Sequence, residues 1–532
     1  MRSKNGLGIF ILLIAGWILT RDLSLWKDLE FGDETTYLAS GVTFSLPFLG
    51  GAQWGPIYAA WYALLHLFVP DRLNLYYFNW ALLSVLAGIS LFVYLRSLQA
   101  SFWVSLIGAV LFAFSAQNLP LNPKISIFPF LLIAFCLSVI HFQKWPNWQR
   151  MLLVAFVGLL CAYCRPEFYL SFLVGSCMSV WFWWRNYLET KTKPLLLVGL
   201  FLACSTALHL LFGNPLFSGD GSRSAAAFQQ HFVINYCAWN QQPEPNTINA
   251  QLDLYHQVFG AEVESMTDAL KVKPALVFRH VFTNVQNTLI ADSKNAVDIF
   301  YQTPLHGWYS RWRIVAFSLF LLAFLAMIDF EKTWQKFRRA SFEGIGLLAL
   351  FVLIFPTLVA TILVYPRTHY LVFHTLLLFW IVAFVSRNIV LKSNQLARFY
   401  PNIISVGLLV FLVVRGFNSP EKQPTPCADN VKFINGLKYK AEVVSLEREW
   451  YRVFLKHSST WVHVEEYTQG DFGQFVREKK VNFILMTLDM QQYFAKDETF
   501  KVFLLQHEKE GFSKLTTNAN REYLLVRKNL LF

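Results

Sequence analysis

Long apolar runs separated by short polar segments dominate the chain up to about residue 416. A helix needs about 20 predominantly apolar residues to cross the hydrocarbon layer of a bilayer, and it satisfies its backbone groups internally as it does so. The pattern predicts a mainly α polytopic membrane protein of eleven transmembrane helices. We expect them at about 6–20, 74–95, 102–118, 125–142, 150–163, 168–185, 194–212, 312–329, 343–364, 369–386 and 401–416.

One further apolar run, at 55–69 (GPIYAAWYALLHLFV), is expected to lie along the membrane interface. Without it, most Lys and Arg of the short loops fall on one side, which the positive-inside rule makes the cytoplasmic side. Counting it as a span would invert that distribution for the rest of the chain. Its aromatic residues Tyr58, Trp61 and Tyr62 are typical of an interfacial helix. The N-terminus is therefore predicted inside and the C-terminus outside.

This topology leaves three long extracytoplasmic segments, at 21–73, 213–311 and 417–532. The transmembrane domain is expected to cover 1–416, and its central loop 213–311 reads as helical, broken by prolines. The tail 417–532 alternates apolar and polar positions like a small α/β accessory domain, and it has no Gly-rich phosphate loop. Its expected strands are 441–446, 460–467, 481–488 and 522–528, and its expected helices lie near 448–457, 471–479 and 497–510.

Composition agrees with a membrane protein. Hydrophobic residues make up 55% of the 532 residues and charged residues 15%, against about 25% in soluble domains. The mean hydropathy is +0.39. The formal net charge of +12 lies largely in the short loops. It is therefore read as a topology signal and not as a nucleic-acid surface. These values exclude a nucleic-acid-binding domain and a cytosolic enzyme, and membrane lipids are the expected surroundings.

Two adjacent carboxylates, Asp33 and Glu34, follow the first predicted span in the segment 31–37 (FGDETTY). Transfer of a group to a hydroxyl needs a base for the hydroxyl proton, and a carboxylate at the membrane surface could supply it. In an extended segment, successive side chains face opposite ways, so only one can point into a narrow cavity. One of the two is then the primary group and the other an auxiliary one; the shorter Asp33 side chain has fewer rotatable bonds and suits the primary role. Asp33 or Thr35 is expected to open a short helix.

Cationic side chains at the predicted outer ends of spans could hold a negatively charged leaving group such as a lipid phosphate. They occur in three short motifs: 122–126 (NPKIS), 164–167 (CRPE) and 365–370 (YPRTHY). The candidate binding residues in these motifs are Lys124, Arg165, Glu167, Arg367, His369 and Tyr370. Arg165 and Arg367 are expected to line one groove with Asp33. His66 and His209, on apolar stretches, are expected to be packed or locally hydrogen-bonded.

The order of these motifs resembles the GT-C membrane glycosyltransferases, most closely the protein O-mannosyltransferase and aminoarabinose-transferase branch. The resemblance covers roughly residues 6–212. It rests on Asp33-Glu34 with Tyr37 three residues on, and on Trp54 to Tyr58 opening the interfacial helix. It implies that Asp33 is the catalytic acid/base or a metal-proximal carboxylate, with Glu34 as the auxiliary group, and that Tyr37, Trp54 and Tyr58 contact substrate. The implied donor is a sugar on a polyprenyl phosphate, and the acceptor a lipid, glycan or protein.

The chain also departs from that family. Members commonly carry a second acidic residue in the outer loop after the third span, whereas 118–130 contains neither Asp nor Glu. The sequence therefore names no metal ligand and leaves a divalent metal cofactor open. Two alternatives stay open: a non-enzymatic transporter or assembly factor, and a lipid-linked glycan ligase or polymerase dependent on Arg367 and His369. No Asn-x-Ser/Thr acceptor occurs in the chain, which favours a bacterial plasma membrane.

Overall fold

The structure is a computed structural model, and its contacts divide the chain into two units. The first unit comprises Met1–Leu19, Phe44–Tyr58 and Leu82–Phe417, and the second Thr20–Thr43, Ala59–Ala81 and Asn418–Phe532. The structure describes residues 2–46, 48, 51–190, 195–215, 223–245, 247–301, 328–339, 344–392, 407, 423–456, 459–468, 470–517 and 522–531.

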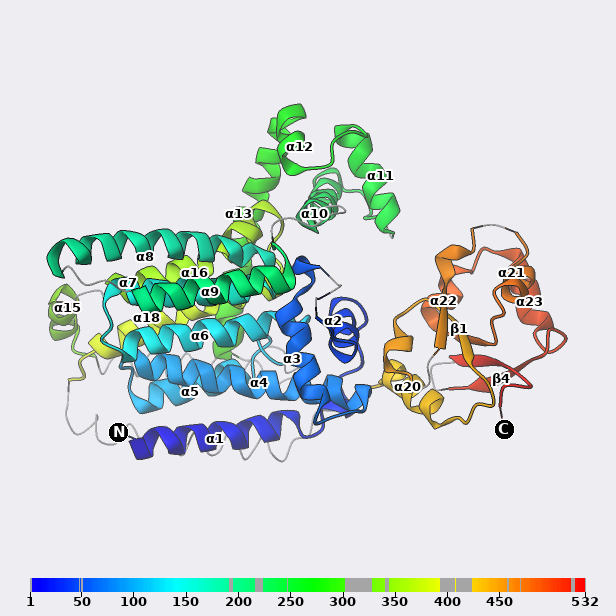
Figure 1. The fold of residues 1–532 in the computed structure, drawn as a ribbon, viewed down its shortest axis with the longest axis horizontal. Helices are drawn as coiled ribbons and strands as arrows, with labels where there is room; N and C mark the ends of the chain where they lie inside the picture. Colours follow the sequence, from blue (N-terminus) through cyan, green and yellow to red (C-terminus); the bar gives the residue numbers. More distant parts are fainter. Residues whose placement is uncertain are drawn as a thin grey trace. The chain divides into compact units, whose positions relative to one another are not determined.

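Packed helices build the first unit (Figure 1). They are α1 (Arg2–Thr20), α5 (Phe102–Ala113), α6 (Ile127–Phe142), α7 (Asn147–Ala162), α8 (Tyr169–Thr190), α9 (Leu195–Phe212), α10 (Arg223–Asn240), α11 (Ile248–Phe259), α12 (Met266–Val272), α13 (Pro274–Tyr301), α15 (Phe330–Arg339), α16 (Gly344–Leu363), α17 (Thr368–Leu371) and α18 (His374–Asn388), with parts of α3 (Pro56–His66) and α4 (Arg72–Ser97). Helices α7 and α8 pack closely because Gly158 has no side chain. A Cβ atom there would lie 2.8 Å from the Phe172 backbone nitrogen.

Among the described residues, five helices are long and apolar enough to cross a membrane: Lys4–Leu25, Arg72–Ser97, Lys124–Phe142, Gly344–Leu363 and Thr368–Asn388. They coincide with five of the eleven expected spans, and by length and composition the chain is a membrane protein. The expected spans at 102–118, 150–163 and 194–212 form shorter apolar helices. The one at 168–185 lies within α8. Those at 312–329 and 401–416 fall almost wholly outside the described residues, so eleven spans stay a prediction.

The run at 55–69 forms the eleven-residue helix α3, about 16 Å long at 1.5 Å per residue and too short to cross a bilayer. The aromatic residues that favoured an interfacial helix in the sequence are mostly buried. Tyr58 and Tyr62 are completely buried and only Trp61 is partly exposed, because the helix packs within the protein. Its position relative to a membrane stays a prediction.

The central segment is helical, as its sequence predicted. Helices α10, α11 and α12 surround a core of Phe228, Phe232, Tyr255 and Phe259. Pro274 is the first residue of α13, where its missing N–H costs no hydrogen bond. The far half of α13 reaches the middle of two candidate spans, since Asp292 and Asn295 share a cavity wall with residues of α16 and α18. The sequence pattern had placed the whole of 213–311 in a loop.

The second unit holds a five-stranded sheet in the order β2-β1-β3-β5-β4. Strands β1 (Val443–Glu447), β2 (Ser459–His463) and β3 (Phe483–Met486) are parallel, and β5 (Tyr523–Arg527) and β4 (Phe512–Thr516) pair antiparallel. Helices α21 (Phe472–Glu478), α22 (Leu488–Tyr493) and α23 (Glu498–Gln506) accompany the sheet. The expected α/β character is confirmed. Strand β4, α22 and α20 (Pro426–Gly436) were not foreseen, and the helix expected at 448–457 is only a 3₁₀ turn at Tyr451–Phe454.

The same unit also contains the chain after the first helix, which binds the tail directly. The Asp28 carboxylate accepts the backbone N–H groups of Cys427 and Ala428, at 3.1 and 2.9 Å. These groups belong to the first turn of α20, where an anion is favoured by the helix dipole. The Phe31 ring lies 4.6 Å from that of Tyr451. The domain boundary expected between residues 416 and 417 stays a prediction. The tail and the segment that contains Asp28 belong to the same unit and are hydrogen-bonded to each other.

Candidate functional site

The two adjacent carboxylates lie in the first turn of helix α2 (Asp33–Val42). Gly32 precedes the helix with φ +123°, a conformation that glycine adopts without strain. The Thr35 hydroxyl accepts the Gly32 N–H at 3.0 Å and donates to the Gly32 carbonyl at 2.8 Å. The premise of an extended segment at Asp33 and Glu34 is therefore wrong. In a helix, neighbouring side chains diverge by about 100°.

Glu34 is 1% exposed and sits in a network of neutral donors from α3 and α4. The Tyr62 hydroxyl donates to Glu34 Oε1 at 2.6 Å, and the Asn79 amide donates to the Tyr62 oxygen at 2.8 Å and to Glu34 Oε1 at 3.4 Å. The Trp61 indole in turn donates to Asn79 at 2.8 Å. Buried polar groups satisfied in this way specify a single arrangement. Asp33, in contrast, is only half-buried.

Close approach of α2 and α3 makes this network possible. A Cβ atom at Gly41 would lie 2.3 Å from Tyr62 Cβ and 2.8 Å from the Ala59 carbonyl oxygen. No other residue fits there without separating the two helices. The glycine therefore brings the Tyr62 hydroxyl within reach of Glu34.

Lys27, which the sequence analysis did not single out, lies in the same unit and is 8% exposed. It pairs with Glu30, and its ammonium lies 4.5 Å from the centre of the Trp80 ring. Burial lowers the pKa of Lys27 from 10.5 to about 8, although the charges of Asp28 and Glu34 act in the opposite direction. In the sequence, the position of Lys27 next to acidic residues is the only signal that could have identified it as a candidate.

In the first unit, three of the expected motifs converge on Arg165, which is 6% exposed. Its Nε donates to Glu167 at 2.8 Å and its Nη1 to the Ser126 hydroxyl at 3.2 Å. Its guanidinium lies 4.7 Å from the centre of the Tyr370 ring. Ser126 follows Lys124, Glu167 belongs to the motif 164–167, and Tyr370 ends the motif 365–370. We call Arg165, Glu167, Ser126 and Tyr370 the Arg165 cluster.

Lys124 belongs to the same region but is completely buried. Its ammonium donates to the Ser84 hydroxyl at 2.9 Å and to the Asn118 carbonyl. These bonds hold α4 against the loop before α6, so the structure gives Lys124 a packing role. Contact with a phosphate would require these bonds to open, and its binding role stays a prediction.

The segment 365–370 is covered by helices from the central region, a contact that the sequence analysis missed. The His231 ring stacks on Tyr365 at 4.9 Å, and His280 Nε2 lies 3.1 Å from the Val364 carbonyl oxygen. Burial, together with the positive charge of Arg367, lowers the pKa of His231 to about 3, so the ring is neutral. Both His231 nitrogens are buried without a hydrogen-bond partner among the described residues. His369 is buried and lies against Tyr370 at 4.5 Å.

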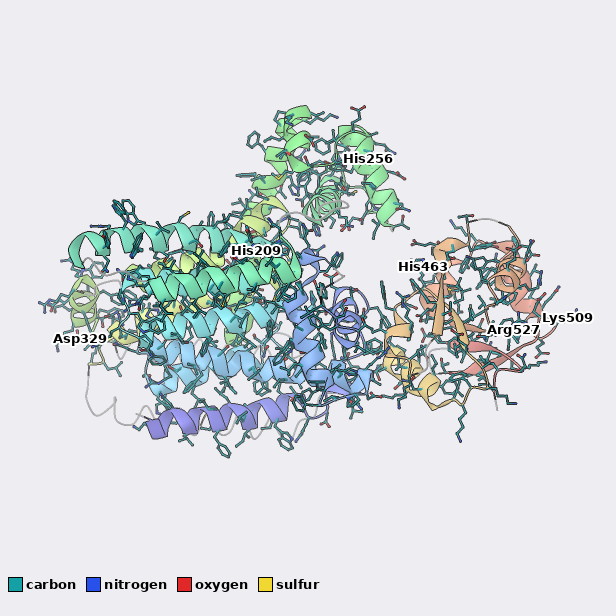
Figure 2. All side chains as sticks on the ribbon, in the orientation of Figure 1. His209, His256, Asp329, His463, Lys509 and Arg527 are labelled. Carbon is teal, nitrogen blue, oxygen red and sulfur yellow. The ribbon has the colours of Figure 1, made fainter. Side chains whose placement is uncertain are left out.

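The remaining predicted residues differ in exposure. Tyr37 and Tyr58 are almost completely buried, whereas Trp54 is 40% exposed. His209, labelled in Figure 2, is locally hydrogen-bonded as expected: its Nδ1 lies 2.7 Å from the Ser205 carbonyl oxygen and its Nε2 3.2 Å from the Tyr169 hydroxyl. His66 likewise bonds locally, to the Val69 carbonyl at 3.3 Å.

Within the part of the chain that the structure describes, no three His, Cys, Asp or Glu side chains lie close enough to hold a metal ion. No chemical step is assigned to a divalent metal. Asp33 and Glu34 belong to the second unit and the Arg165 cluster to the first. That Asp33, Arg165 and Arg367 line one groove stays a prediction.

Comparison of the chain with models of known protein families and with curated proteins finds no match. The resemblance to the GT-C glycosyltransferases thus rests on the short motifs and their order alone.

Proposed function

We propose that this chain is a membrane glycosyltransferase that moves a sugar from a polyprenyl-phosphate donor to a lipid, glycan or protein acceptor. The observation that carries the proposal is the Arg165 cluster. Three motifs that were selected separately as phosphate-binding candidates meet at one buried guanidinium. Aromatic faces such as that of Tyr370 suit the apolar face of a sugar, and a guanidinium suits a phosphate.

In the proposed reaction, the acceptor oxygen bonds to C1 of the sugar while the bond from C1 to the phosphate oxygen breaks. Negative charge collects on the departing polyprenyl phosphate, and Arg165 stabilises it with fixed donors. The acceptor proton passes to a carboxylate. We assign this role to Asp33, the half-buried member of the adjacent pair. Glu34 is buried and its carboxylate already accepts hydrogen bonds from Tyr62 and Asn79.

The test is transfer of labelled sugar from a polyprenyl-phosphate donor by the purified full chain in detergent. Asp33→Asn keeps the size of the side chain but removes its basicity, so turnover should fall by about 10²–10⁴ while the protein still folds. Glu34→Gln is the matched control and should lose less turnover. Near-normal turnover of Asp33→Asn with a large loss in Glu34→Gln would reverse the two roles. A wild-type protein that transfers no sugar from the donors would overturn the proposal.

One observation favours the transporter as second candidate. A transporter places ionisable residues inside its spans, and among the described residues His374 lies in the candidate span Thr368–Asn388, where it pairs with Asp292 of α13. Movement of a labelled polyprenyl-phosphate sugar across vesicles containing the protein, without any glycosylated product, would favour this candidate. Product formation without such movement would remove it.

A further inference from the structure

A cavity of about 280 Å³ lies among helices α13, α16 and α18 of the first unit. Most of its wall is apolar, formed by residues such as Phe351, Ile354, Leu371 and Leu378. Phe351 is 47% exposed and Ile381, on the α18 side of the wall, 45% exposed. Large exposed apolar side chains on candidate spans are typical of a surface that faces lipid. The cavity is therefore suited to a molecule that enters from the membrane.

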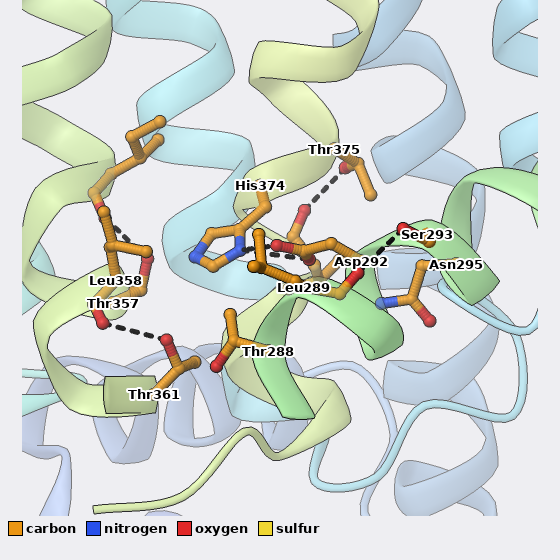
Figure 3. Close-up of polar contacts among 12 residues, drawn as sticks. Thr288, Leu289, Asp292, Ser293, Asn295, Thr357, Leu358, Thr361, His374 and Thr375 are labelled. Atoms are coloured by element: carbon orange, nitrogen blue, oxygen red, sulfur yellow. Dashed lines mark hydrogen bonds and ion pairs between the residues drawn. The ribbon is translucent and has the colours of Figure 1, made fainter. Parts of the chain in front are cut away.

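Three polar groups interrupt this apolar wall: the His374–Asp292 pair, Asn295 and Thr375, whose hydroxyl donates to the Val372 carbonyl (Figure 3). His374 Nδ1 lies 2.9 and 3.1 Å from the two carboxylate oxygens of Asp292. A ring nitrogen facing a carboxylate carries the proton, and in the neutral ring the other nitrogen, Nε2, is then an acceptor. That nitrogen is buried and has no hydrogen-bond partner within the described ranges.

The second polar group is Asn295, one turn further along α13 and only 9% exposed. Its amide oxygen accepts a hydrogen bond from Gln117 at 2.7 Å, which fixes the side chain. Its amide nitrogen is buried without a partner among the residues that the structure describes. A buried donor left unsatisfied costs about 1–3 kcal/mol, and so does a buried acceptor. One wall of the cavity thus presents both an unsatisfied acceptor and an unsatisfied donor.

We propose that this cavity binds a membrane lipid alcohol. A hydroxyl group both donates and accepts, so it can donate to His374 Nε2 and accept from the Asn295 amide, while the hydrocarbon part lies against the apolar wall. A phosphate only accepts hydrogen bonds, so it would place an anion against the acceptor His374 Nε2 and leave that nitrogen without a donor. An ammonium donates only and would leave the Asn295 amide unsatisfied. This site is distinct from the Arg165 cluster, and the inference does not depend on the proposed glycosyl transfer.

The test uses the purified full chain in detergent and a photoreactive hexadecanol, with the corresponding hydrocarbon and hexadecyl phosphate as comparison compounds. The alcohol should label peptides of α13, α16 or α18, and unlabelled hexadecanol should compete. His374→Phe removes the acceptor but keeps a ring, and should weaken labelling about 10-fold. Asn295→Leu should weaken it to a similar extent. Ser293→Ala is the matched control, because Ser293 is on α13 but is not among the residues that line this cavity, and its hydroxyl donates to the Leu289 carbonyl of its own helix.

Competition in the wild-type protein tests the proposal without any variant. Stronger competition by hexadecanol than by the hydrocarbon supports the lipid alcohol. Equal competition by hexadecanol and the hydrocarbon, with labelling unchanged in His374→Phe, would show that the cavity binds hydrocarbon without recognising the hydroxyl group. That result would overturn the proposal. Stronger competition by hexadecyl phosphate would show that His374 is protonated and that the site holds an anion, which would also overturn it.

Discussion

The Glu34 network and the Arg165 cluster both bury a charged side chain, but they do so in opposite ways. Neutral donors from Tyr62 and Asn79, on the next two helices along the chain, hold the Glu34 carboxylate. A carboxylate, a hydroxyl and an aromatic ring from three separate segments hold the Arg165 guanidinium. The first arrangement fixes neighbouring helices relative to one another. The second joins distant parts of the chain around a group suited to a phosphate.

This difference predicts a structural role for the Glu34 network and a functional role for the Arg165 cluster. Removal of a donor to Glu34 should cost stability, since the network has little exposed surface through which to meet a substrate. Removal of the Arg165 charge should cost donor binding and turnover, because a guanidinium paired with a carboxylate can also hold a phosphate oxygen.

Replacement of Arg165 should have the largest effect. Arg165→Met is expected to lower turnover by about 10²–10³, in proportion to the loss of one preorganised donor to the developing charge. Arg165→Lys keeps the positive charge but lacks the planar guanidinium, and it should recover part of the lost turnover. Steady-state kinetics should show a raised KM for the donor and an unchanged KM for the acceptor. Unchanged donor kinetics in Arg165→Met would make the cluster structural, like the Glu34 network.

Tyr62→Phe should destabilise the protein by about 1.5 kcal/mol, since a hydrogen bond to a charged group is lost while the ring remains. The measurement is chemical unfolding of the purified protein in detergent. Tyr77→Phe is the matched control, because its hydroxyl donates to a neutral backbone carbonyl, that of Lys27, and should cost less. A double-mutant cycle of Tyr62→Phe with Glu34→Gln should show coupling, and strictly additive losses would contradict the bond.

The last prediction is a dependence of stability on pH through Lys27. Burial lowers its pKa to about 8 in the folded protein, against 10.5 in the unfolded chain. Between these values the unfolded state binds more protons, so stability rises with pH from about 8 to 10.5. Thermal unfolding of the wild type and of Lys27→Met across this range should show a rise that the variant lacks. A rise of equal size in both proteins would assign it to other groups.

The membrane-protein class, the helical central segment and the α/β character of the tail could be predicted from the sequence, because apolar periodicity is a local property. Span length was less certain. Several apolar runs fold as shorter helices. The run expected at 102–118 is helical only to Ala113, and the polar residues Ser115, Gln117 and Asn118 follow in a loop. Strand β4 was missed because Phe512–Thr516 alternates weakly and gains its strand conformation by pairing with β5.

The candidate site residues show the same division between what the sequence predicts and what the tertiary structure decides. Sequence selected Arg165, Glu167 and Tyr370 by residue type and by their position after apolar runs, and tertiary structure decided that they touch. Sequence could not foresee that Glu34 is buried against Tyr62, that His231 covers Tyr365 or that Asp292 meets His374. These contacts join side chains far apart in the chain, and only the packing of helices settles which polar groups lose water and must find partners. Hydropathy fixes how much of this chain is removed from water, whereas the tertiary fold fixes which charges are removed together.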